Sequence, residues 1–103
     1  MVRYTTPTFT LTLPDSVDLT QATNVYVTFA KGDNKMTKTD EEIEVSAHSV
    51  DVYLSQEETA AFTSGLVQIQ MNWTYSETGG IRRACTEIVT VNVTPNLLNE
   101  VVE

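Results

Sequence analysis

The stretch Leu66-Val-Gln-Ile-Gln-Met-Asn-Trp-Thr-Tyr75 decides the fold class, because apolar and polar side chains alternate along it. Successive side chains of a β-strand point to opposite faces of its sheet. The polar set is Gln68, Gln70, Asn72 and Thr74, and the apolar set is Val67, Ile69, Met71, Trp73 and Tyr75. This pattern predicts a long strand with one face against a core and the other toward water.

Shorter segments of the same kind surround this strand and define the rest of the sheet structure. The patterns predict strands at 8–13, 24–30, 35–39, 43–45 and 50–54, and a return strand at 82–94. The polar segment around Met36 is typical of an edge strand. The return strand changes phase near Ile88 and Val89, which predicts a bulge or a second half paired with a different sheet.

These elements together predict one domain. The chain has 103 residues, of which 17 are Thr and 13 are Val, two β-branched types that favour strands. About seven short strands joined by close turns indicate an all-β protein. We expect a small antiparallel immunoglobulin-like β-sandwich that spans residues 1–103.

Two segments depart from the strand pattern. Ser55 and Glu58 have the spacing of a capping box, which predicts a short helix over 56–63 that ends near Gly65. The segment 96–103 is an apolar C-terminal tail whose aliphatic residues have helical spacing: Leu97, Leu98, Val101 and Val102. The sequence leaves open whether this tail packs on its own sandwich or on a neighbouring subunit.

Composition excludes several classes of function. The net charge of −8 argues against a nucleic-acid partner, which would select a basic surface. The single cysteine, Cys85, excludes an internal disulfide framework and a multi-cysteine zinc site. No apolar run approaches the roughly 20 residues that span a bilayer, and no signal-peptide pattern opens the chain. We therefore expect no membrane partner, and no cofactor motif is present.

The residues that could carry chemistry have simpler interpretations. His48 lies in a polar turn, and Cys85 lies on a strand near Arg82 and Arg83. Neither belongs to a catalytic or redox motif. An acidic group without calcium-loop spacing predicts a charged turn and a protected edge: Asp33, Asp40, Glu41, Glu42 and Glu44. Adjacent helix positions do not face each other, so Glu57 and Glu58 are not expected to form an acid–base pair. We predict that the protein is not an enzyme.

The tyrosines suggest a binding surface instead. Tyr26 and Tyr53 fall on predicted outer faces, where exposed tyrosines favour a protein interface. The alternative is a sugar-binding platform. It would include three further aromatic residues, Tyr4, Trp73 and Tyr75. The position of Trp73 among core-facing residues speaks against this alternative.

Several segments resemble a known family. They are Thr5-Thr-Pro-Thr-Phe-Thr-Leu11, Val25-Tyr-Val-Thr-Phe-Ala-Lys-Gly32, Leu54-Ser-Gln-Glu-Glu-Thr59 and Val67-Gln-Ile-Gln70. Together they resemble small prophage-encoded proteins of Firmicutes. The connector Asp18-Leu-Thr-Gln-Ala22 is similar to a stretch in the N-terminal immunoglobulin-like domain of phage baseplate upper proteins. The chain departs from that stretch at Gln21, where Gly is common, and lacks the long downstream region of those proteins.

The resemblance implies a non-enzymatic phage or prophage structural protein. Such a protein would be a tail- or baseplate-associated protein–protein attachment module, made in the bacterial cytoplasm and then carried in the virion. Its partners would be other phage structural proteins or a second copy of the chain. The expected interface residues are Tyr26, Tyr53, Leu97, Leu98, Val101 and Val102. The alternative function is a carbohydrate- or host-surface-binding module.

Overall fold

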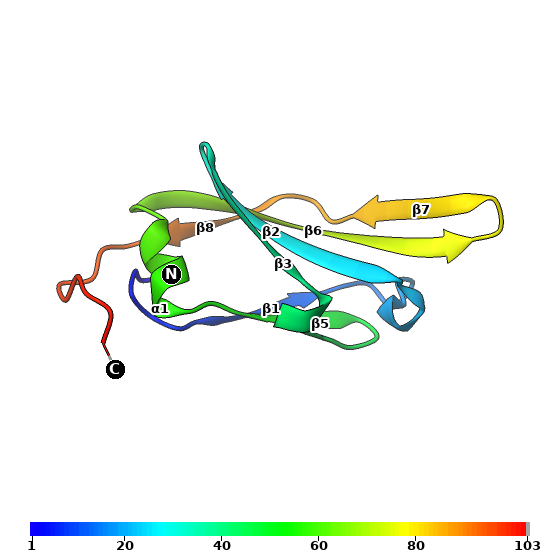
Figure 1. Ribbon diagram of the computed structural model, residues 1–103, viewed down its shortest axis with the longest axis horizontal. Coiled ribbons are helices and arrows are strands. Elements are labelled where there is room, and N and C mark those ends of the chain that lie inside the picture. Colours follow the sequence, from blue (N-terminus) through cyan, green and yellow to red (C-terminus); the bar gives the residue numbers. More distant parts are fainter. Residues whose placement is uncertain (103) are drawn as a thin grey trace.

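Two antiparallel sheets pack face to face in the computed structural model, which describes residues 1–102 (Figure 1). The smaller sheet has the strand order β1 (Thr8–Thr12), β5 (Ser49–Tyr53), β4 (Ile43–Val45). The larger sheet has the order β3 (Asn34–Thr39), β2 (Asn24–Lys31), β6 (Gly65–Glu77), and β6 then pairs with both β7 (Gly80–Cys85) and β8 (Val89–Val93). The predicted small all-β sandwich is confirmed.

The strand order matches most of the strand order of an immunoglobulin-type sandwich. In immunoglobulin-type sandwiches, strands A, B, E and D form one sheet, and strands C and C′ join F and G in the other. Here β1, β5 and β4 take the places of B, E and D, and β3, β2 and β6 take those of C′, C and F. The β7 and β8 strands share the place of G. Within the described residues 1–102, no strand occupies the place of A beside β1.

The β6 strand forms the centre of the core, as the alternating stretch predicts. Val67 and Met71 are fully buried, and Trp73 is 5% exposed. The polar residues between them face outward. Across the sandwich, the ring of Phe29 in β2 lies between Phe9 and Phe62, at centroid distances of 5.9 and 6.4 Å. The core therefore spans both sheets and the segment that follows the helix.

The return strand contains the predicted bulge. Cys85 pairs with Asn72 and Val89 pairs with Ile69, so three residues, Thr86–Ile88, oppose only two residues of β6. The Thr86 amide donates to the Met71 carbonyl (2.9 Å), and the Met71 amide donates to Thr86 Oγ1 (3.1 Å). Both halves pair with β6, so the alternative of a different sheet is wrong.

The helix α1 (Gln56–Ala61) begins as predicted but ends earlier. The Glu58 amide donates to Ser55 Oγ, and the Ser55 amide donates to Glu58 Oε1 (2.8 Å), which confirms the capping box. Gly65 does not end the helix; it begins β6 with a φ of 130°. Side chains from distant segments instead donate hydrogen bonds to the last carbonyls of the helix. Arg3 donates to the Ala60 carbonyl and Asn34 donates to the Ala61 carbonyl.

The two ends of the chain lie at the same end of the sandwich (Figure 1). Residues 1–7 do not run straight into β1: Val2 forms a parallel bridge to Thr94, and the chain then turns at Tyr4, whose φ is 63°. The expected helical stripe of the tail is wrong for the described residues, because 96–102 contain no helix. Gln56 instead holds the tail through both backbone groups of Val102, at 2.7 and 2.9 Å. Glu103 lies outside the described residues.

Candidate docking groove

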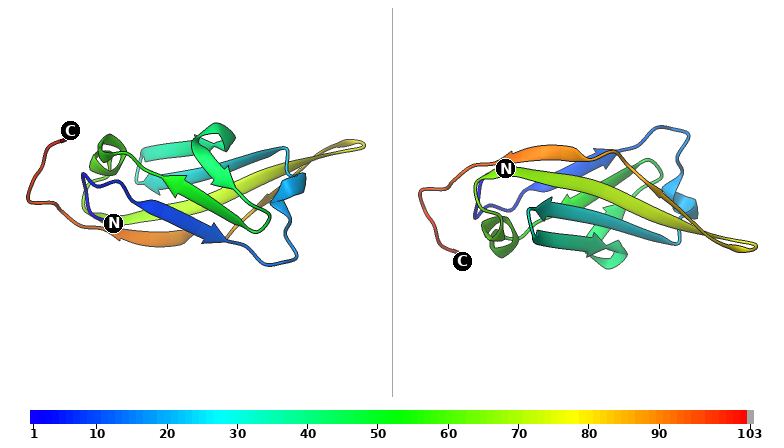
Figure 2. Two further views of the ribbon diagram at one scale, coloured as in Figure 1. Left: turned by 90° about the horizontal axis from the view of Figure 1, so that it is seen from below. Right: turned by 90° about the horizontal axis from the view of Figure 1, so that it is seen from above.

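The two sheets meet along two long sides of the sandwich, and these sides differ. On one side the chain passes directly from β3 to β4 through the 3-10 turn η2 (Asp40–Glu42). We call this the closed side. On the other side β1 faces β8, and Figure 2 shows β1 (blue) and β8 (orange) along the same long edge of the molecule. We call this the open side.

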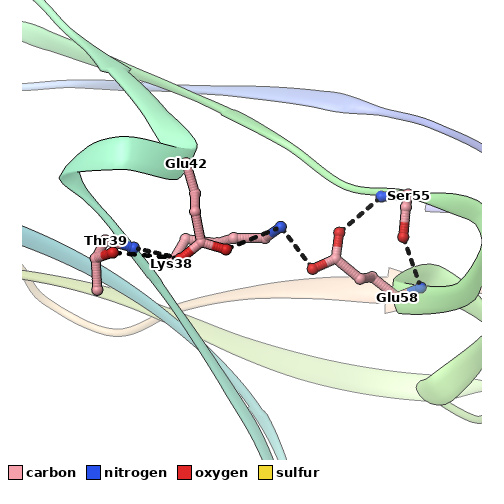
Figure 3. Close-up of polar contacts among 5 residues, drawn as sticks. All are labelled: Lys38, Thr39, Glu42, Ser55 and Glu58. Carbon is pink, nitrogen blue, oxygen red and sulfur yellow. Dashed lines mark hydrogen bonds and ion pairs between the residues drawn. The ribbon is translucent and has the colours of Figure 1, made fainter.

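The closed side contains a buried cation. Lys38 of β3 is 7% exposed, and its Nζ lies 2.5 Å from Glu58 Oε2 in α1 and 3.9 Å from Glu42 Oε2 in η2 (Figure 3). Glu42 also accepts a hydrogen bond from the Thr39 amide, and Glu58 accepts one from the Ser55 amide. Both carboxylates therefore accept hydrogen bonds from backbone amides. The cluster is a structural contact that joins β3, η2 and α1.

The charged environment sets the acidity of Glu58. Partial burial alone would raise the pKa of its carboxyl, but the hydrogen bonds from Lys38 and the Ser55 amide, with the Lys38 charge, hold the pKa below its ordinary value. The carboxylate is therefore ionised when it bridges to Lys38. This pair links the helix to the edge of the larger sheet.

The open side contains an apolar groove of about 510 Å³ between the two sheets. Its floor is made by core residues of β6, and its walls come from the end of β1 and from the β7–β8 bulge. The apolar lining consists of Leu11, Leu13, Pro14, Val17, Ile69, Met71, Trp73 and Val89. The polar lining consists of Thr12, Gln70, Cys85, Thr86 and Glu87. The groove thus reaches the core where the return strand is interrupted.

The β1 strand presents an unpaired backbone edge beside this groove. The Leu13 amide donates to the His48 carbonyl, and the Leu54 amide donates to the Pro7 carbonyl. Backbone groups of an antiparallel strand point alternately toward and away from the partner strand. Odd-numbered residues of this segment therefore bond toward β5, and the amides and carbonyls of Thr8, Thr10 and Thr12 point away from it.

The chain's own N-terminal residues cover only one end of the facing strand. The Arg3 amide donates to the Thr94 carbonyl (3.0 Å), and the Thr94 amide donates to the Met1 carbonyl (2.8 Å). The N-terminal amine of Met1 also donates to the Asn92 carbonyl (2.7 Å), so this pairing covers the end of β8 that is far from the bulge. Val89, next to the bulge, is 52% exposed. The open side is therefore closed at one end and accessible along the groove.

His48 and Cys85 take part in different contacts. The half-buried His48 ring is 2.6 Å from the Val17 carbonyl, so it holds the β1–β2 connector against the turn that precedes β5. Cys85 is exposed and borders the groove, and because it pairs with Asn72 its side chain lies on the outer face of the larger sheet. Its neighbours Arg82 and Arg83 contact Glu77 and Asn72. The two residues do not share hydrogen-bond partners.

The acidic turn is part of the closed side. Asp40 Oδ1 accepts a hydrogen bond from the Val25 amide, and Glu42 belongs to the Lys38 contact. Among residues 1–102, no group of three His, Cys, Asp or Glu side chains is placed to hold a metal ion. The connector segment has a similar local role: Asp18 accepts from the Thr20 amide and hydroxyl, which lowers the pKa of its carboxyl, and Leu19 is buried.

The predicted interface residues do not form one surface. Tyr26 lies on the outer face of the larger sheet and Tyr53 on the outer face of the smaller sheet, so they point away from the sandwich in opposite directions. Partial loss of water and the charge of Glu44 raise the pKa of Tyr53. With Trp73 buried, the aromatic residues form no row. The tail is exposed at all four aliphatic positions: Leu97, Leu98, Val101 and Val102.

The comparisons with known proteins assign no family. No protein-family model matches the chain, and no curated protein or solved structure shows a significant similarity to it. Across residues 1–102, none of the helices has the length and apolar character needed to span a membrane.

The sequence did not predict the groove. Its walls come from segments far apart in the chain, and alternation alone cannot show that two sheet edges leave a space between them. The phase change near Ile88 and Val89 was the available signal, since a bulge interrupts an edge. The outward-pointing amides of β1 could be identified only once the register between β1 and β5 was known.

Proposed function

We propose that this protein is a non-enzymatic protein–protein attachment module whose open side receives a partner. The observation that carries this proposal is the coincidence of an apolar groove with the unpaired edge of β1. Exposed apolar surface and free strand edges are the features that proteins use for partner binding or otherwise cover. Of the titratable side chains described above, Asp18, Asp40 and His48 bond to backbone groups, and Lys38 bonds to Glu42 and Glu58.

The resemblance noted in the sequence supports a more specific proposal. We infer a phage or prophage structural protein of a tail or baseplate, made in the bacterial cytoplasm and carried in the virion. Its partners would be other phage structural proteins or a second copy of the chain. The segments that carry the resemblance have structural roles here, as in the cap that Asp18 provides to the turn η1 (Leu19–Gln21).

The experiment mixes the purified chain with each product of the genes that flank its own gene. Size-exclusion chromatography with light scattering then measures whether a complex of defined mass forms. The proposal expects one such complex, and expects Val89→Glu in the groove wall to abolish it. Val45→Glu provides a matched control, because Val45 is also exposed but lies on the closed side in β4. A chain that remains free in every mixture would contradict the proposal.

A glycan array tests the alternative function. The scattered positions of Tyr26 and Tyr53 and the burial of Trp73 do not favour a sugar platform. We expect no binding across the array. Binding that is lost on Tyr53→Ala would favour the carbohydrate-binding alternative.

A further inference from the structure

We propose that the partner of the open side is an extended segment of another protein, with alternate apolar side chains and at least one Lys or Arg. The segment would add to β1 as a strand and insert its apolar side chains into the groove. This inference rests on the proposed attachment function and specifies the chemistry of what is attached.

The backbone of β1 selects an extended partner. The outward amides and carbonyls of Thr8, Thr10 and Thr12 repeat every second residue, as the edge of a sheet does. A strand laid along this edge would form ladder hydrogen bonds, the mode known as β-augmentation. The added strand would occupy the sheet position that strand A holds in immunoglobulin-type sandwiches. A helix or a globular surface would leave these backbone groups unpaired.

The groove selects the side chains of that strand. One face of an added strand would point between the sheets, toward Leu11, Leu13 and Trp73. Its other face would remain in water beside the outward threonines. Alternate apolar residues match this environment because the side chains of a strand alternate between faces. The groove has a volume of about 510 Å³, which these side chains would occupy.

The negative charge at the groove favours a basic partner. Of the groove-lining residues in the described part of the chain, Glu87 is the one that carries a charge. Its side chain is exposed at the bulge, and the whole chain has a net charge of −8. Opposite charge raises the rate of encounter and suppresses like-charged competitors. A Lys or Arg at the end of the inserted face would approach the Glu87 carboxylate.

Charge and existing contacts disfavour the tail of a second copy as the occupant of the groove. The tail is apolar and exposed at Leu97, but it contains Glu100 and no basic residue. Its Val102 backbone is already bonded to Gln56 of its own chain. A second copy would also bring its own charge of −8 toward the acidic surface. Insertion of this tail is therefore an alternative outcome of the test and not the proposal.

The experiment uses a reporter thiol placed in the groove wall by Val89→Cys in a Cys85→Ser background, because Val89 lines the groove and pairs with the inward-facing Ile69, whereas Cys85 pairs with the outward-facing Asn72. The rate of its alkylation by iodoacetamide is measured with three synthetic peptides. The first is acetyl-Lys-Val-Thr-Ile-Thr-Val-Lys-amide. The second replaces both Lys with Glu, and the third replaces the aliphatic residues with Ser. A peptide of residues 95–103 represents the tail.

We expect the first peptide, at about 1 mM, to slow alkylation about fivefold, as a complex with a Kd of a few hundred micromolar would. The acidic and serine peptides should change the rate by less than about twofold. Glu87→Gln should weaken the protection severalfold, whereas Glu57→Gln, the same change on the exposed face of α1, should not. Thr12→Pro, which removes an outward amide, should weaken it, and Thr12→Val should not.

Three outcomes would overturn the inference. No protection by the basic peptide would exclude an added strand in this groove. Equal protection by the acidic peptide would exclude selection by charge, and protection by the tail peptide alone would assign the groove to a second copy. Each of these leaves the attachment function separately testable, since a complex with a flanking gene product that survives Val89→Glu would place attachment on another surface.

Discussion

The closed and open sides of this sandwich differ in how the edges of their outer strands are covered. Every two-sheet sandwich has two sides at which the outer strands of both sheets expose backbone groups. On the closed side, the chain crosses between the sheets through η2, and Lys38 connects this turn to α1. On the open side, the N-terminal segment pairs with the end of the return strand around Thr94, and a groove beside the bulge reaches the core.

Under the proposed attachment function, a partner on the open side would bind without breaking contacts of the fold. Side chains on the closed side are bonded to each other and to backbone amides, so a partner there would displace existing contacts. The groove on the open side lies beside the unpaired edge of β1. Stability should therefore depend on the closed side, and binding should depend on the open side.

Truncation of the two phenylalanines that flank Phe29 should give the largest effects. Phe62 follows α1 and is 1% exposed, whereas Phe9 of β1 is only half-buried. We expect Phe62→Ala to reduce the free energy of unfolding by about 3–5 kcal/mol and Phe9→Ala by about half as much. Urea unfolding measures both values. Equal losses would show that the open side is packed as tightly as the other.

Removal of the buried cation should have the next largest effect. Lys38→Met leaves Glu58 and Glu42 without their counter-ion, and we expect a loss of about 2 kcal/mol in the free energy of unfolding. The value falls below that of a fully buried pair because both carboxylates keep contact with water. Lys35→Met, an exposed change on the same strand, should alter stability by less than about 0.5 kcal/mol. Similar effects of the two substitutions on the free energy of unfolding would show that the cluster has no structural role.

The pH dependence of stability should report the same contact. The pKa of Glu58 is lower in the folded protein than in the unfolded chain, so its ionised form favours folding. This contribution is complete above the ordinary pKa of Glu and is lost as the pH falls through the lowered value in the folded state. We expect the stability difference between the wild type and Glu58→Gln to shrink from about pH 6 to about pH 3. A difference that stays constant with pH would contradict this assignment.

Proline substitutions on β1 should have the smallest effect where the amide points outward. Thr12→Pro removes no ladder hydrogen bond, and we expect it to cost less than about 1 kcal/mol. Leu11→Pro, one residue away, removes an amide that points toward β5 and should cost about 3 kcal/mol or more. Thermal unfolding followed by circular dichroism compares the two variants. A reversed order would show that the edge of β1 has been assigned to the wrong residues.

The sequence was sufficient for those features that depend on local pattern. Alternation from Val67 to Trp73 identified the central strand, and the phase change near Val89 identified the bulge. The capping box of Ser55 and Glu58 identified the beginning of α1. Each of these features depends on residues that are close together in the chain.

The features that sequence analysis missed depend on distant contacts. The helix ends at Ala61 because Arg3 and Asn34 bond to its last carbonyls, so no glycine is required there. The tail has helical spacing, but Gln56 holds the backbone of Val102 in a non-helical path. The burial of Lys38 and the groove likewise require segments that only the fold brings together.

Hydrogen exchange followed by NMR tests the central claim most directly, because it observes the open edge with and without an added strand. In the free protein, the amides of Thr8, Thr10 and Thr12 should exchange fast, whereas those of Leu11 and Leu13 should be protected. Addition of the basic alternating peptide should slow exchange at the three threonines and leave the amide of Lys38 unchanged. Protected threonine amides in the free protein, or threonine exchange that the peptide does not slow, would contradict the account.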